Sequence, residues 1–337
     1  MVKYVLLEEL HHFRSAESEE DIVQALALIA VLLLAPDDRA GFADADGATA
    51  IGDHLVRLCH EQGGAKIKWR TSNVFGFVIT KKLLPTFVRY ALVCIIHATL
   101  DASMAQDLCS MGLPQLLLLE FIINPVQELE DIVSDNQLSS SEVEDPPCHI
   151  LALEALRNLV YLESETTLIS HGALDAMWHT LLQPSEREME RLLMCDVLTN
   201  LTSHSPRATF ATKDRLALLL ALLLNENAHG DKISDHSTSV ALQTAMADFG
   251  CNLARDTEYS IVFICTLEAH RPRARMNQSS IAFLGHWADT ATDEGLSASL
   301  RSFTHNLAWT DVSTKVCVQK LSASSFVERF IGVKSEI

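Results

Sequence analysis

The chain has few glycines, prolines and aromatic residues, and it lacks a long uninterrupted apolar run. Its 337 residues include 13 Gly and 9 Pro, and aromatic residues make up 6%. So few turn-forming residues argue against a sandwich or barrel and favour helices joined by short loops. The longest purely apolar run is 11 residues, 25–35, whereas a membrane-spanning helix needs roughly 20. We therefore expect a soluble, mainly helical protein.

Local motifs for catalysis and for cofactor or metal binding are absent too. The sequence has no GxGxxG loop, no P-loop, no GxSxG elbow and no HExxH, and none of its 8 cysteines forms a CxxC pair. Two histidine-rich stretches, His11-His12 and His54–Cys59–His60, lack the spacing of a metal site. We expect no metal, no cofactor, no small-molecule substrate and no enzymatic activity. An active site assembled from distant residues would leave no such motif and stays open.

Positive charge is scarce, since 44 acidic residues stand against 26 basic ones and give a formal net charge of −18. Such a surface repels phosphate groups, so we expect neither nucleic acid nor a membrane surface as partner. A basic protein segment or surface fits better. Several cysteines lie inside apolar runs, where a reduced thiol acts as a small hydrophobic group. This favours a cytoplasmic location, to which the nucleus is a possible addition.

Residues 91–156 contain no Lys or Arg, and seven acidic residues crowd between Glu128 and Asp145. Low hydrophobicity and charge of one sign predict a flexible acidic loop at about 125–147. Ser139 and Ser141 each have an acidic residue three positions downstream, a pattern that acidophilic kinases use. We note both serines as candidate phosphorylation sites, although the pattern is common by chance.

Most of the chain shows apolar residues with a period near 3.6, over lengths that suit globular helices. These predicted helices cover residues 22–34, 84–100, 113–123, 150–162, 173–182, 189–201, 215–224, 239–253, 260–267, 279–287, 296–309 and 314–331. Residues 37–64 interrupt the pattern, with a short helical patch at 51–59. Trp178, Trp287 and Trp309 lie in apolar helical runs, which favours core packing over ligand stacking.

An Asn-Leu pair recurs at the end of four of these apolar runs. The asparagines are Asn158, Asn200, Asn252 and Asn306, spaced by 42, 52 and 54 residues. Residues 90–119 have the same layout, with His97 or Ala98 where the asparagine would be, and Gly112 corresponds to Gly172. The shorter spacing fits helical repeats of roughly 40–47 residues, which stack and share one continuous core. The glycine permits a left-handed turn between two helices.

The runs that end in Asn-Leu resemble the armadillo-repeat family, most clearly ALEALRNLVYLESETTLISHGALDAMWHTLL at 152–182 and LLMCDVLTNLTSHSPRATFATKDRLALLLALLL at 192–224. The resemblance implies an all-α, right-handed superhelical solenoid whose third helices line a concave groove for partner proteins. We predict an N-terminal helical cap at residues 1–83 that matches the repeat poorly. Armadillo-like repeats would follow at 84–331, and a C-terminal tail at 332–337.

Members of this family hold extended peptides with a ladder of asparagines on the third helices. The resemblance carries this role to Asn158, Asn200, Asn252 and Asn306, because a side-chain amide can pair with a peptide main chain. The simpler interpretation is that each asparagine bonds a carbonyl near a helix end. Importin-type receptors place Trp one turn before the asparagine, where this chain has Glu154, Asp196, Asp248 and Ser302. That absence argues against nuclear-import cargo.

The three acids lie four residues before an asparagine and so share its helix face. We interpret Glu154, Asp196 and Asp248 as an acidic stripe for a basic segment, with ordinary solvated positions as the simpler alternative. The sequence thus favours a non-catalytic scaffold or adaptor that binds a protein or peptide in the groove. A regulatory factor acting on an ATPase or GTPase domain, as exchange factor or chaperone, is the alternative function.

Overall fold

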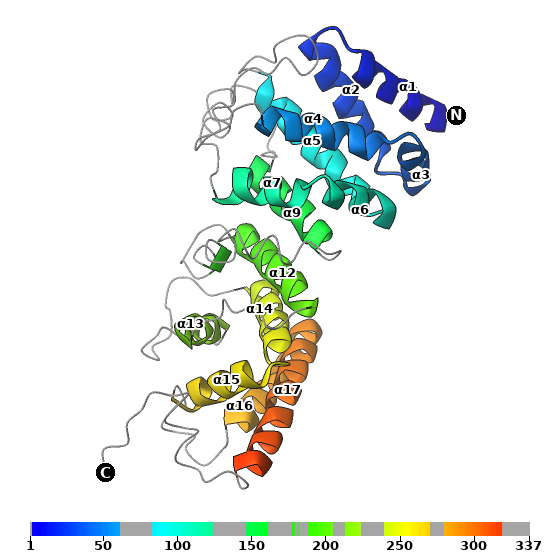
Figure 1. The fold of residues 1–337 in the computed structure, drawn as a ribbon. Helices are drawn as coiled ribbons and strands as arrows, with labels where there is room; N and C mark the ends of the chain where they lie inside the picture. Colours follow the sequence, from blue (N-terminus) through cyan, green and yellow to red (C-terminus); the bar gives the residue numbers. More distant parts are fainter. Residues whose placement is uncertain are drawn as a thin grey trace. The chain divides into compact units, whose positions relative to one another are not determined.

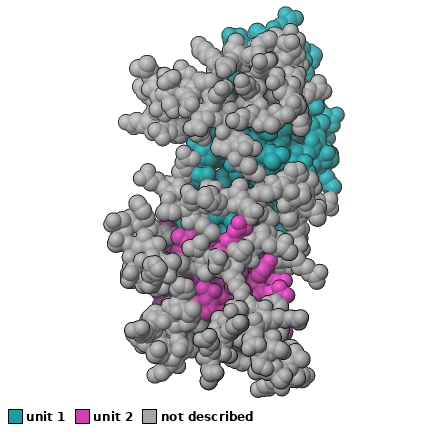
Figure 2. All heavy atoms as spheres, turned by 60° about the vertical axis from the view of Figure 1, so that its left-hand side comes forward, with its two compact units in different colours: residues 1–201 teal, residues 202–337 magenta. Residues whose placement is uncertain are grey.

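The computed structural model describes residues 2–60, 83–123, 146–160, 177–178, 181, 188–204, 213–223, 239–269 and 280–318. Every regular element within these ranges is a helix. The chain divides into two compact units, Met1–Leu201 and Thr202–Ile337, coloured separately in Figure 2. The described helices bear out the all-α prediction.

Unit 1 begins with two antiparallel helices that pack against each other, α1 and α2 (Figure 1). Ser18 starts α2 because its hydroxyl accepts the Asp21 N–H at 3.2 Å and donates to the Asp21 carboxylate at 2.7 Å. A short helix, α3, and two longer ones, α4 and α5, follow. The bounds are Val2–Ser15, Glu19–Leu32, Pro36–Asp44, Gly47–His60 and Leu84–Ala98 for α1 to α5.

The same order of one short and two longer elements recurs in the next part of unit 1. Helix α6 (Ala102–Ser110) starts at Asp101, whose carboxylate accepts the N–H groups of Ser103 and Met104. Helix α7 (Leu113–Leu117) continues as the π-helix η1 (Leu118–Ile123), and α9 (Cys148–Val160) packs against α5. Unit 1 ends at Leu201, within helix α12 (Glu188–His204).

Unit 2 contains α13 (Lys213–Leu223), α14 (Val240–Leu253), α15 (Thr257–Ala269), α16 (Ser280–Thr290) and α17 (Glu294–Val318). Helix α17 packs against α14, α15 and α16 (Figure 1). The apolar residues of both units point inward at helical spacing. In α5 the buried set includes Phe87, Val88, Ala91, Leu92 and Ile95, and in α14 it includes Leu242, Met246, Phe249 and Leu253. Helices of this kind are held mainly by shared aliphatic packing.

Three sequence predictions are wrong in detail. Residues 37–60, expected to be mostly irregular, form α3 and α4, because Pro36 occupies the first turn of α3 and two aspartates follow it there. The expected break after residue 309 is absent, since α17 runs on to Val318 without a Gly or Pro to end it. Trp178 is buried as expected, but Trp309 is 73% exposed.

The loop predicted at 125–147, the candidate phosphorylation sites Ser139 and Ser141, Gly172 and the C-terminal tail fall outside the described residues, except for residues 146–147. The division into an N-terminal cap at 1–83 and repeats at 84–331 stays a prediction.

Gly112 joins α6 to α7 in the left-handed conformation that the repeat pattern predicts. Its backbone φ angle is +78°, a value that residues other than glycine adopt only at a cost in free energy. We expect Gly112→Ala to lower the free energy of unfolding by about 1–2 kcal/mol. Urea unfolding followed by circular dichroism measures this change.

Gly285→Ala is the matched control. Gly285 lies inside α16, and an added Cβ would meet Thr304 Cγ2 at an ordinary 3.8 Å. Alanine there should raise stability by about 0.5–1 kcal/mol. Equal effects of the two substitutions would contradict the role of the left-handed turn.

Candidate protein-binding face

Three helices share one pattern of backbone hydrogen bonds at their C-terminal ends. In α2, α5 and α14, the N–H of the capping residue donates to the carbonyl four positions earlier. The next N–H donates to the carbonyl three positions earlier, at 3.2–3.3 Å. The capping residues are Leu33, Thr99 and Ala254. We call the residue two before the cap the ladder position; it is Val31 in α2, His97 in α5 and Asn252 in α14.

The asparagines of unit 1 reach back to earlier helices of the same unit. Asn158 Nδ2 donates to Thr99 Oγ1 at 2.9 Å, which connects α9 to α5. Asn200 Nδ2 donates to the carbonyl of Arg157 at 2.9 Å, which connects α12 to α9. Both asparagines are half-buried. The side-chain amides of unit 1 therefore connect α9 to α5 and α12 to α9.

Unit 2 repeats this arrangement. Asn306 Nδ2 donates to the carbonyl of Cys251 at 2.9 Å and also approaches Cys251 Sγ at 3.3 Å. Cys251 directly precedes Asn252, as Arg157 directly precedes Asn158, so Asn200 and Asn306 use equivalent acceptors. Asn252 itself is only 8% exposed. An amide offers two N–H donors and an acceptor oxygen.

The acidic stripe of unit 1 includes a basic residue. Arg157 Nη2 lies 3.9 Å from Glu154 Oε1, and Arg157 Nη1 lies 3.5 Å from Asp196 Oδ2. About a third of each of these side chains is exposed. In unit 2, Asp248 and Ser302 occupy the corresponding position and are exposed. The local sequence pattern did not reveal Arg157, because its partner Asp196 is on another helix.

His97 brings a titratable group to the ladder position of α5. Burial lowers the pKa of its imidazole, and the charge of Arg39 lowers that pKa further, while Glu154 opposes the shift. The Arg39 guanidinium donates to the carbonyls of Leu33 and Leu34 at 3.0 and 3.3 Å, at the end of α2. Positive charge thus lies beside the N-terminal end of the ladder.

Sequence reasoning missed Val31, because an aliphatic residue takes the place of the asparagine there. The position three after each ladder residue is exposed where the structure describes its side chain. It holds Leu34, Leu100, Arg255 and Trp309. The exposure of Trp309 therefore follows from its place three residues after Asn306. In α2 and in α5, buried apolar residues come as adjacent pairs with the same spacing. This shared spacing is the signal in the sequence that could have revealed Val31 as the counterpart of His97.

Among the described residues, no group of three His, Cys, Asp or Glu side chains could hold a metal ion. The imidazole of His54 instead hydrogen-bonds the Ala50 carbonyl at 2.6 Å, and its ring lies 5.0 Å from that of Phe13. Within the described ranges, no helix combines the length and the apolar character needed to cross a bilayer.

No family model and no curated protein sequence matches this chain. Solved structures do match. An engineered protein determined by the Northeast Structural Genomics Consortium superposes with a TM-score of 0.58 at 13% identity, covering 90% of this chain and 97% of that one. A designed armadillo repeat protein superposes with a TM-score of 0.57 at 12% identity, covering 90% and 99%. The chain therefore has the armadillo-like repeat fold, an all-α solenoid of helical repeats, as its Asn-Leu pattern predicts.

Proposed function

We propose that this protein is a non-catalytic scaffold that binds an extended segment of a partner protein along its third helices. The observation that carries the proposal is the recurrence of a half-buried side-chain amide at Asn158, Asn200 and Asn306, each of which bonds an earlier helix of its own unit. The armadillo-like fold supports it, since such repeats commonly present their third helices to a partner.

Photo-crosslinking tests which face the partner uses. Benzoylphenylalanine would replace Val31 on α2 or Ser302 on α17, both of which are exposed. The same residue at Tyr4 on α1 or Thr290 on α16, also exposed, is the control. We expect partners captured under native conditions to crosslink from Val31 or Ser302 and not from the controls. Equal crosslinking from all four positions would refute the proposed face.

Substitution of the amides tests their part in binding. We expect Asn158→Ala combined with Asn200→Ala to weaken capture of the crosslinked partner by roughly tenfold, since each amide offers hydrogen bonds to a main chain. Gln243→Ala is the matched control, because Gln243 Nε2 donates to the Leu223 carbonyl at 3.3 Å but lies away from the ladder position. Unchanged capture by the double variant, with its fold intact, would limit these asparagines to a structural role.

A further inference from the structure

Exposed aliphatic side chains gather on the ladder face of α2 and α5, at the N-terminal end of unit 1. Leu28, Val31 and Leu34 of α2 are 42%, 63% and 59% exposed, and Leu100 after α5 is 56% exposed. Residues three apart share one face of a helix. Large apolar side chains grouped on an exposed face commonly mark an interaction site.

These residues hold equivalent positions on two helices that pack against each other. Helix α2 packs against α5, and the Cys94 thiol donates to the Leu26 carbonyl at 3.6 Å. Leu34 and Leu100 both donate their N–H to the carbonyl of a ladder residue, Val31 and His97 respectively, at 3.3 Å. Leu34 and Leu100 therefore hold the same position on neighbouring helices. We call Leu28, Val31, Leu34 and Leu100 the apolar patch.

The charges next to the apolar patch disfavour a basic ligand. Arg39 binds the carbonyls at the end of α2, and it acts electrostatically on His97, where Glu154 acts in the opposite sense. Farther along the ladder, Arg157 already lies between Glu154 and Asp196. A lysine or arginine from a partner would compete with Arg157 for these carboxylates, and it would meet Arg39 beside the patch. Charge complementarity thus favours a segment without basic side chains here.

We infer that unit 1 binds an extended partner segment whose large aliphatic side chains cover the apolar patch, and that Arg157 keeps basic segments from this face. The inference rests on the proposed function and specifies its ligand: an apolar segment takes the place of the basic one that the acidic stripe suggests for unit 1.

Two fluorescent synthetic peptides of equal length test the ligand class, with either leucine or lysine at every second position among serines. Fluorescence anisotropy with the full chain at low salt measures their dissociation constants. We expect the leucine peptide to bind at least roughly tenfold more tightly than the lysine peptide. Equal or tighter binding of the lysine peptide would overturn the inference.

Single substitutions then locate the binding surface. Val31→Glu and Leu34→Glu should each weaken binding of the leucine peptide by roughly tenfold, because each puts a charge where an aliphatic side chain is covered. Val240→Glu is the control, since Val240 is an exposed valine of α14 in unit 2. Thermal unfolding verifies that each variant folds. Unchanged binding by both patch variants would overturn the inference.

Arg157→Gln tests the second half of the inference. Removal of the guanidinium leaves Glu154 and Asp196 without this cation, so the lysine peptide should bind roughly tenfold more tightly at low salt. This gain should vanish at high salt. Arg301→Gln is the control, because Arg301 pairs with Asp289 at 3.3 Å in unit 2. No gain with Arg157→Gln would refute the role of Arg157.

Crosslinking distinguishes failure of the inference from failure of the proposed function. A partner that crosslinks at Val31 or Ser302, while the leucine peptide does not bind, overturns the apolar ligand and leaves the scaffold function standing. Absence of both the peptide complex and the crosslink refutes both.

Discussion

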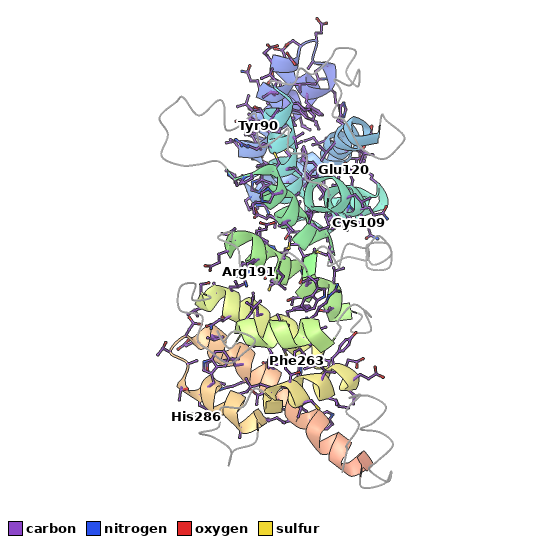
Figure 3. The ribbon with its side chains drawn as sticks, turned by 90° about the vertical axis from the view of Figure 1, so that its left-hand side faces the viewer. Tyr90, Cys109, Glu120, Arg191, Phe263 and His286 are labelled. Atoms are coloured by element: carbon purple, nitrogen blue, oxygen red, sulfur yellow. The ribbon has the colours of Figure 1, made fainter. Side chains whose placement is uncertain are left out.

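Replacement of Phe303 by alanine is expected to lower the free energy of unfolding of unit 2 by about 3–5 kcal/mol. Phe303 is fully buried on α17, and its ring meets that of Phe263 edge-on, with centroids 5.1 Å apart and an interplanar angle of 83° (Phe263 is labelled in Figure 3). On the other side, a Cβ built on Gly250 of α14 would lie 3.3 Å from Phe303 Cζ. The ring therefore joins α14, α15 and α17 in one core.

The size of the effect follows from two losses. Truncation to alanine removes the free energy gained by burying the ring, and it leaves a cavity. The surrounding helices fill this cavity only in part, because each is held in place by its other neighbours. It also removes the edge-to-face contact with Phe263, which contributes about 0.5–1.5 kcal/mol beyond burial. Urea unfolding followed by circular dichroism, with the transition of each unit fitted separately, measures the change.

His305→Ala on the same helix is the control, because His305 is exposed. It should change stability by less than about 0.5 kcal/mol. Phe303→Leu keeps much of the apolar volume and should lie between the two. A loss below about 1 kcal/mol for Phe303→Ala would show that this core collapses around the cavity, in conflict with the packing described.

The long helices of the repeats could be predicted from the sequence because each carries its signal locally. Leu, Ile and Ala recur with the helical period in α5, α9, α12 and α14, and the predicted ranges agree with these helices to within a few residues. Gly112 was predicted for the same reason, since a glycine between two apolar runs indicates a left-handed turn. Prediction of the fold required little more than this helical period and its repetition along the chain.

The details of the proposed binding face could not be predicted, because they depend on side chains far apart in the sequence. Arg157 and Asp196 are 39 residues apart, and their ion pair exists only after α9 and α12 stack. Asn200 likewise finds its acceptor 43 residues earlier. Val31 holds a ladder position without an amide, so alignment on Asn-Leu pairs passes over α2. Periodicity shows which residues are buried, while stacking decides which exposed residues become neighbours.

The thiols of Cys94 and Cys195 are expected to react with iodoacetamide at least roughly a thousandfold more slowly in the folded chain than after denaturation. Both side chains are buried, and burial raises the pKa of each thiol well above its ordinary value. Asp196 raises the pKa of Cys195 further, whereas Arg191 (labelled in Figure 3) lowers it. The thiolate is the reactive form, so neither cysteine should react while its helix stays packed.

The thousandfold difference in labelling rate follows from the free energy needed to open the helices around each thiol. If these helices must open before the thiol is exposed, an opening free energy of about 4 kcal/mol slows labelling by roughly a thousandfold. Mass spectrometry of timed, quenched samples gives a rate for each cysteine. Cys109, which is only partly buried although its thiol donates to the Leu159 carbonyl at 3.6 Å, should react faster than Cys94.

The pH dependence reveals the route by which Cys94 reacts. Labelling through an open state follows the ordinary thiol pKa of about 8.5, so the rate should level off above that pH. Labelling of the packed thiol would instead keep rising with pH, because its own pKa is much higher. We expect the levelling, at a rate far below that of the denatured chain. A rate within about tenfold of the denatured value would mean that α5 opens at a cost below about 1.4 kcal/mol, which is too little for a helix packed between α2 and α9.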